Sequence, residues 1–201
     1  MRLHLVRHAV TAETGLRLSG RLPGIPLSSA GVEMATAVAD HLAATKFEAL
    51  YTSPIERCRQ TAAATAVERP IRPRADKAFI EADYGRWSGR TLKSLYKLKA
   101  WQGLMAGPAR FRFPDGETLG EVQNRSVSRV EQLAMEHDGN VAVSSHADVI
   151  RAILVHYLGM PLDLIHRIDV LPASLSVVDL HPSGAVRVPV VNYVADMKRW
   201  R

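Results

Sequence analysis

Three places in this sequence carry basic or imidazole side chains just after a short run of strand-forming residues. They are Arg7-His8 after residues 3–6, Arg57 after residues 49–52, and His146 after residues 141–145. Two guanidinium groups fit the oxygens of a phosphoryl group. A neutral imidazole can attack phosphorus, and a second histidine can stabilise charge in the transition state. Together these side chains predict phosphoryl-transfer chemistry.

Such chemistry also needs a proton for the departing alcohol. Glu81 follows an apolar segment, residues 78–80, and is the carboxyl that the sequence places best for this role. The same group could afterwards deprotonate a water molecule that hydrolyses the phosphohistidine. Asp83 and Glu117 are the acidic residues that compete for this role.

The elements that must position these groups are strands followed by helices. In open α/β sheets, ligands bind beyond the carboxyl ends of the strands. We therefore expect the strands at residues 3–6, 49–52 and 141–145 to end side by side. Ser53-Pro54-Ile55-Glu56 predicts a capping box with a helix from Ser53, which puts Arg57 in a first turn that favours anions.

The remaining pattern predicts further helices, an irregular region and a hairpin. Helices are expected after a cap at Ser28 or Ser29, from Thr91, from Glu117 to Asp138-Gly139, and after His146. Residues 11–27 predict a loop, residues 78–80 an edge strand or extended segment, and residues 175–191 a hairpin. Gly103 and Gly107 are expected to interrupt the pattern within residues 82–116, which we interpret as a lid.

Five motifs in this order resemble the histidine phosphatase superfamily. They are Arg7-His8-Ala9 with Thr11, the stretch from Ser53 to Ala62, Glu81 with Gly85-Arg86-Trp87-Ser88-Gly89, Asp115-Gly116-Glu117-Thr118, and Ser145-His146-Ala147. The resemblance implies that His8 is the phosphorylated nucleophile, that Arg7, Arg57 and His146 form the phosphate pocket, and that Glu81 donates the proton. It also implies one α/β domain over residues 1–201, a three-layer α/β/α sandwich around a mostly parallel mixed sheet, and catalysis without a metal or cofactor.

The chain departs from the family pattern at three positions. Ala9 and Ala147 stand where glycine usually follows each histidine, and the backbone N–H groups that could meet phosphate are retained. Thr14 replaces a frequent asparagine and still offers a hydroxyl. We expect Thr11, Thr14 and Ala147 to contact the substrate.

The lid region suggests what the substrate looks like. It is shorter than the insertions of the mutases that resemble this chain, which favours a phosphatase, with a phosphoglycerate-type mutase as the alternative. Seven basic residues and no acidic one lie between Arg86 and Arg112. We therefore expect a small, acidic phosphomonoester that also contacts Arg110 and Arg112.

The composition of the chain indicates its cellular compartment and the kind of partner it binds. The 201 residues are 47% hydrophobic, with a formal net charge of +6, and contain one cysteine, Cys58. No signal peptide and no apolar run near the ~20 residues of a membrane span is visible. A lone cysteine favours a reducing compartment. We expect a cytoplasmic protein with a small-molecule substrate and no nucleic-acid or membrane partner, and we leave a homodimer open.

The residue types also allow three other kinds of site. A zinc site could use His4, His8 and His146, although no HExxH or paired-cysteine spacing accompanies them. A thiol phosphatase could use Cys58, but the arginine needed six residues later is replaced by Ala64. A non-catalytic module could bind polyanions through the basic surface, but such a module has no use for a proton donor. Motifs of P-loop, dinucleotide and serine-hydrolase enzymes are absent.

Overall fold

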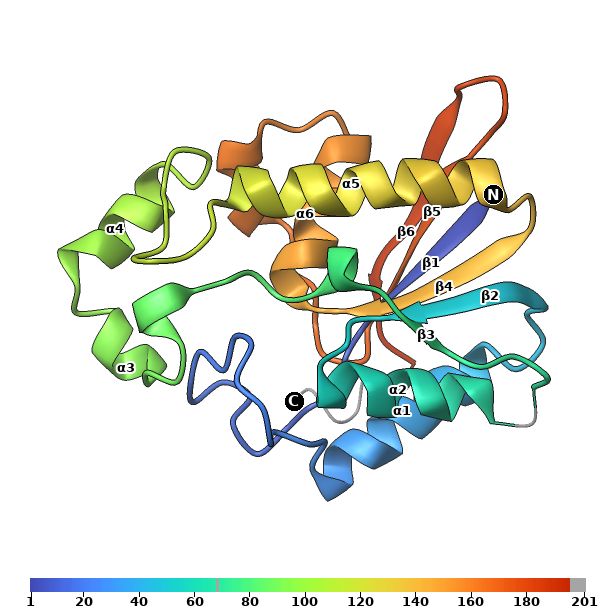
Figure 1. Ribbon diagram of the computed structural model, residues 1–201, viewed down its shortest axis with the longest axis horizontal. Coiled ribbons are helices and arrows are strands. Elements are labelled where there is room, and N and C mark those ends of the chain that lie inside the picture. The colour runs from blue at the N-terminus through green and yellow to red at the C-terminus, as the bar shows by residue number, and fades with distance from the viewer. Residues whose placement is uncertain (68, 196–201) are drawn as a thin grey trace.

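The computed structural model describes residues 1–67 and 69–195, and its centre is a six-stranded mixed sheet (Figure 1). The strands are β1 Arg2–Arg7, β2 Phe47–Thr52, β3 Arg74–Ala75, β4 Asn140–Ser145, β5 Leu175–Leu180 and β6 Val186–Tyr193. Their spatial order is β3-β2-β4-β1-β5-β6. The β3–β2, β2–β4 and β4–β1 pairs are parallel, and β5 and β6 add an antiparallel edge. The expected mostly parallel mixed sheet and the final hairpin are confirmed.

Helices cover both faces of this sheet and make three layers (Figure 1). On one face lie α1 Ser29–His41 and α2 Glu56–Ala66, and on the other lie α5 Leu119–Glu136 and α6 Ala147–Tyr157. The smaller helices are α3 Leu92–Leu95 and α4 Lys99–Ala106, with 3₁₀ turns at Lys77–Phe79, Gly85–Trp87 and Leu162–Arg167. Within residues 1–67 and 69–195, no helix is both long and apolar enough to cross a membrane.

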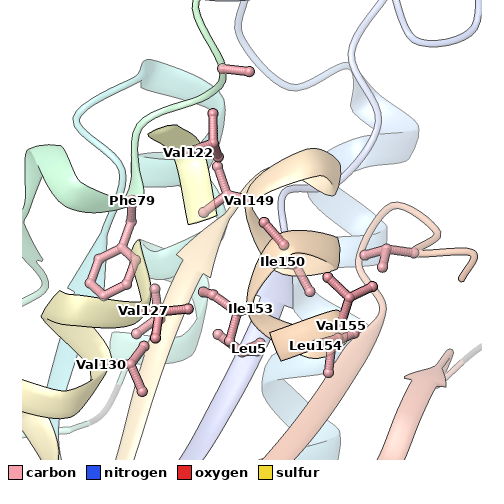
Figure 2. Close-up of a cluster of buried hydrophobic side chains, with 14 of the residues drawn as sticks. Leu5, Phe79, Val122, Val127, Val130, Val149, Ile150, Ile153, Leu154 and Val155 are labelled. Carbon is pink, nitrogen blue, oxygen red and sulfur yellow. The ribbon is translucent and has the colours of Figure 1, made fainter. Parts of the chain in front are cut away.

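Alternation along β1 divides the core between the two helical layers. Leu3 and Leu5 are fully buried in the cluster that includes α5 and α6, whereas Val6 belongs to the cluster around α1. Figure 2 shows Leu5 together with Val127 of α5 and Ile153 of α6. Each such buried aliphatic side chain contributes on the order of 2 kcal/mol through loss of contact with water. Because β1 is packed on both faces, the residues at its end are held by a rigid element.

Local side-chain chemistry confirms some expected boundaries and corrects others. Ser28 caps α1 by accepting the N–H of Gly31, as expected. The helix expected from Ser53 begins instead at Glu56, without a side-chain cap; Ser53 Oγ accepts the Ile55 N–H over 3.3 Å and lies 2.8 Å from His146 Nε2. The edge strand expected at residues 78–80 is found earlier in the chain, at β3. Residues Lys77–Phe79 form a 3₁₀ turn instead, because Asp76 caps it by accepting the Ala78 N–H. Gly103 lies inside α4 rather than interrupting it.

The region interpreted as a lid, which carries α3 and α4, extends to one side of the sheet beyond the strand ends (Figure 1). Its two ends meet in a short stalk, where the Glu117 N–H donates to Asp83 O and the Arg86 N–H donates to Pro114 O, both over 2.9 Å. The backbones approach so closely that a Cβ on Gly85 would lie 2.0 Å from Pro114 O. Glycine is therefore required at this contact.

Candidate active site

The three strand ends that carry the candidate residues are neighbours in the sheet, because β4 lies between β1 and β2. Arg7 is level with Ser145, and the His8 N–H donates to Ser145 O over 2.9 Å. On the other side of β4, the Ser53 N–H donates to Ser144 O over 2.9 Å. The expectation that these strand ends meet is confirmed.

The hydrogen bonds of His8 define which of its ring nitrogens is free to react. Nε2 accepts a bond from Arg57 Nε at 3.1 Å, and a guanidinium can only donate. Nδ1 lies 2.8 Å from Ala9 O and therefore carries the proton. Burial, followed by the charges of Arg57 and Arg7, holds the pKa of His8 well below its usual value. The ring is neutral at neutral pH, with its lone pair on Nε2.

His146 is fully buried behind Arg57 and does not line the cavity. Its Nδ1 accepts from Arg57 Nη2 at 3.2 Å, so Nε2 carries the proton and donates to Ser53 Oγ. Burial and the charge of Arg57 hold the pKa of His146 well below its usual value. The structure therefore brings His146 to the site as a neutral support for Arg57, and it does not place the ring among the residues that line the cavity.

Each of the two arginines is anchored by a bond to a backbone carbonyl and has one buried nitrogen without a partner in the described residues. Arg7 Nη1 donates to Val170 O over 2.6 Å, and Arg57 Nη2 donates to Gly20 O over 2.7 Å. Arg7 Nε and Arg57 Nη1 are buried, and neither has a hydrogen-bond partner in the described part of the chain. Buried charged donors without partners are costly. Their arrangement beside His8 suits an anion.

Glu81 lines the same cavity, and its carboxyl is protonated over much of the neutral range. Burial, followed by the nearby negative charge of Asp148, raises the pKa of Glu81 to about 7. Oε1 accepts the Ala82 N–H over 3.0 Å, and Oε2 lies 3.7 Å from His146 Nδ1. The backbone is held as well, because Arg21 Nε donates to Glu81 O over 2.8 Å. A carboxyl poised in this way can act as an acid and then as a base.

The two carboxyls expected to compete with Glu81 serve the lid stalk instead. Glu117 is paired with Arg21 and Arg125 at 2.8 and 3.0 Å. Asp83 accepts the Gly85 N–H over 2.9 Å. Neither Asp83 nor Glu117 lines the cavity. This leaves Glu81 as the better candidate for the proton donor.

The other expected substrate contacts line the same cavity. Thr11, Thr14 and Ala147 are among its lining residues, and Thr14 Oγ1 accepts the Thr11 N–H over 2.9 Å. The Ala9 N–H, which is retained as the sequence indicates, donates to Thr61 Oγ1 over 3.2 Å.

Arg110 and Arg112 are not brought to the cavity. Arg110 is exposed, and Arg112 donates to Glu121 over 2.6 Å and to Gly116 O over 2.9 Å. Arg86 likewise pairs with Asp115 at 2.9 Å. Acidic partners outside the basic stretch thus bind these side chains on the outer surface. The expected contacts of Arg110 and Arg112 with substrate are not supported.

Sequence reasoning missed a second set of residues that line the cavity, which has a volume of about 560 Å³. Asp148 lies in the first turn of α6, where it accepts from Tyr84 and Arg151 over 2.8 and 3.0 Å. Because Asp148 follows His146 by two residues, the sequence could have indicated that it lies near the site. The lid contributes Trp101, Leu104 and Met105, whose spacing on α4 is that of one helical face.

The alternative sites lack the geometry that they need. His4 Nε2 lies 3.1 Å from Asn140 Oδ1 and its ring packs against Phe47, so it belongs to the α1 side of the sheet. In the described residues no group of three His, Cys, Asp or Glu side chains is placed to hold a metal ion. Cys58 is buried, and burial raises the pKa of its thiol well above the usual value. A protonated thiol is a poor nucleophile.

Known proteins share both the sequence pattern and the fold. The chain is 29% identical to phosphoserine phosphatase 1 of Hydrogenobacter thermophilus over 189 residues, which cover 90% of this chain and 87% of that protein. Among solved structures it is similar to a mycobacterial glucosyl-3-phosphoglycerate phosphatase complexed with VO3, with a TM-score of 0.85, 25% identity and coverage of 95% and 98% of the two chains. The α-ribazole phosphatase of Shigella flexneri shares the fold, with a TM-score of 0.85, 23% identity and 96% coverage of each chain.

A family model also matches nearly the whole chain. The sequence model of the histidine phosphatase superfamily (branch 1) matches residues 3–192. This range includes all six strands, apart from Arg2 at the start of β1 and Tyr193 at the end of β6. The chain therefore belongs to the histidine phosphatase superfamily, branch 1.

Proposed function

We propose that this phosphatase hydrolyses phosphomonoesters through a phosphohistidine on Nε2 of His8. The observation that carries the proposal is the arrangement around this atom. Its lone pair is fixed by the Nδ1–H bond to Ala9 O, and two arginines with unpaired N–H groups flank it. Glu81, with a pKa of about 7, stands on the same cavity. A nucleophile, an anion site and a proton donor are therefore present together.

In the first step the phosphoryl group binds to the guanidinium groups of Arg7 and Arg57. His8 Nε2 attacks phosphorus, so a P–N bond forms while the bond between phosphorus and the alcohol oxygen breaks. The carboxyl of Glu81 gives its proton to that oxygen, and the alcohol leaves neutral. The two arginines stabilise the charge on the transferring group.

In the second step the carboxylate of Glu81 removes a proton from water. The water oxygen attacks phosphorus, and the P–N bond breaks to release inorganic phosphate. Glu81 is protonated again, and His8 regains its neutral ring with the proton on Nδ1. The bond from Nδ1 to Ala9 O persists through both steps and keeps the tautomer unchanged.

Several features support a hydrolase over the other candidates. Phosphatase is the activity named for the relatives cited above. A binding module would need the arginines but would gain nothing from a buried carboxyl with a raised pKa. Our wider expectations of a cytoplasmic setting, a small-molecule substrate, no nucleic-acid or membrane partner and an open question of homodimerisation remain part of this proposal.

The test is a panel of phosphomonoesters assayed in excess chelator with the wild type and His8→Ala. We expect phosphate release by the wild type alone, and a phosphoenzyme that is labile in acid and stable in base. Retained turnover in His8→Ala would contradict the proposal. Transfer of label to an isomeric hydroxyl of the substrate, instead of to water, would favour the mutase alternative.

A further inference from the structure

The cavity is larger than a phosphoryl group requires. Arg7, His8, Arg57 and Glu81 form one part of its lining, which we call the phosphate floor. The remainder, which we call the outer chamber, lies between the loop after β1, the lid and the start of α6. A total of about 560 Å³ is within the range of pockets that enclose drug-sized ligands. The outer chamber therefore has room for a sizeable alcohol part of the substrate.

The lid side of the outer chamber is apolar. The apolar and aromatic lid side chains there include Leu92, Tyr96, Trp101, Leu104, Met105 and Phe113, and the loop after β1 adds Leu18. Trp101 is held by ring contacts, since its ring stacks on Trp87 with centroids 5.9 Å apart and meets Tyr96 edge-on at 4.8 Å. Binding of a hydrocarbon group against such an apolar wall is favourable, because it removes apolar surface from water.

The charged side chains of the outer chamber already have partners. Arg151 donates to Asp148 and to Ile168 O, over 3.0 and 2.8 Å. Arg17 donates to Gly89 O over 3.0 Å and pairs loosely with Glu13. A second anionic group on the substrate would therefore meet guanidinium groups whose charge is already partly offset by Asp148 and Glu13.

His166, a further titratable residue that lines the outer chamber, adds no positive charge. Burial lowers the pKa of His166 below its usual value, so its ring is neutral at neutral pH. The buried guanidinium N–H groups that lack a partner in the described residues belong instead to Arg7 and Arg57, on the phosphate floor. Anion recognition is thus concentrated where the phosphoryl group binds.

Resting on the proposed function, we infer that the preferred substrate is a phosphomonoester whose alcohol part is apolar and uncharged, with an aromatic or extended alkyl group that fills the outer chamber. This inference replaces the expectation of an acidic substrate. That expectation depended on lid cations, and Arg110 and Arg112 do not line the cavity. The phosphate floor supplies the anion site, and the lid supplies selectivity for the alcohol.

The first experiment compares kcat/KM for methyl, butyl and 3-phenylpropyl phosphate, whose alcohols are of similar basicity. We expect kcat/KM to rise by roughly fourfold for each methylene that becomes buried, and by about a hundredfold or more from methyl to phenylpropyl. Butyl phosphate should also exceed the phosphate ester of 4-hydroxybutanoate, which differs by a terminal carboxylate. A flat alkyl series, or preference for the carboxylate, would overturn the inference.

The second experiment changes the lid without disturbing the core. Tyr96 and Met105 line the cavity but are 54% and 48% exposed, so a Tyr96→Ala/Met105→Ala variant should fold. We expect about a tenfold loss of kcat/KM on 3-phenylpropyl phosphate and less than a twofold change on methyl phosphate. Met135→Ala, at a methionine 81% exposed on α5, is the matched control and should change neither.

The two proposals fail in different ways. If no ester is hydrolysed, or if hydrolysis survives His8→Ala, the proposed function fails and the inference fails with it. If hydrolysis depends on His8 but the lid variant loses equally on both substrates, the phosphatase stands and the apolar subsite is refuted.

Discussion

Arg57 Nε donates a hydrogen bond to His8 Nε2 over 3.1 Å. The lone pair that must attack phosphorus is therefore the acceptor of a bond from one of the two arginines that bind the phosphoryl group. The nitrogen cannot react while this bond exists. Binding of a phosphoryl group gives Arg57 a stronger, charged acceptor. We therefore expect phosphoryl binding to Arg57 to weaken its bond to His8 and to free Nε2 for the attack.

Arg57→Ala should raise the pKa of His8, because the positive charge of Arg57 opposes protonation of the ring; burial, the larger cause of the depression, would remain. We also expect kcat/KM to fall by about a thousandfold, since one phosphate ligand is lost. Titration of the His8 ring by NMR and steady-state kinetics measure the two effects. Arg59→Ala, at an exposed arginine of the same helix, should change neither.

The pH dependence should follow Glu81. Its protonated form is the proton donor, so kcat/KM for an alkyl phosphate should decline as pH rises through about 7, its pKa in the folded protein. Glu81→Gln should abolish this limb and lower kcat/KM by about 10² to 10⁴. With nitrophenyl phosphate, whose alcohol leaves without a proton, the loss should be under tenfold. Equal losses on both esters would argue against Glu81 as the acid.

Glu81 should also reduce stability above neutral pH. Its pKa is about 7 when folded and near the ordinary 4.5 when unfolded, so the unfolded state releases the proton more readily. Below pH 4.5 both states are protonated and the residue has no effect. Above pH 7 the folded state carries a penalty of about 3 kcal/mol. Urea unfolding should therefore find Glu81→Gln more stable than the wild type at pH 8, and no different at pH 4.

The Cys58 thiol should be dispensable for the chemistry. It is buried, and burial raises its pKa, so it is neither ionised nor accessible. Cys58→Ala should keep kcat within about threefold, and iodoacetamide should not inactivate the folded wild type. Loss of the phosphoenzyme in Cys58→Ala would revive the thiol mechanism.

The lid stalk should not tolerate a side chain on Gly85. A Cβ there would lie 2.0 Å from Pro114 O, and the residue has a φ of +50°, so Gly85→Ala should cost about 2 kcal/mol or more. Gly107→Ala is the control, because a Cβ at that position meets nothing within 4 Å. Urea denaturation of the two variants measures the difference. Similar stabilities would mean that the stalk relaxes easily.

The sequence allowed prediction of what is encoded locally. Runs of branched residues marked β1 and β4, and the polar residues that end them marked the site. The start of α2 was predicted three residues too early, since Ser53 Oγ is shared between the Ile55 N–H and His146, 93 residues away, and the latter contact depends on the tertiary fold. The basic residues of the lid were misread for a similar reason. Arg112 pairs with Glu121, which lies outside the basic stretch.

The placement of β4 between β1 and β2 has a consequence for biosynthesis. Residues 2–7 and 47–52 leave the ribosome early, but the strand that joins them spans residues 140–145. Until that strand is made, the ends of β1 and β2 are not aligned in one sheet, and His8 and Arg57 have only their direct contact and that of Ala9 with Thr61 to bring them together. We therefore expect a nascent or truncated chain that lacks residues 140–145 to be inactive on phosphate esters.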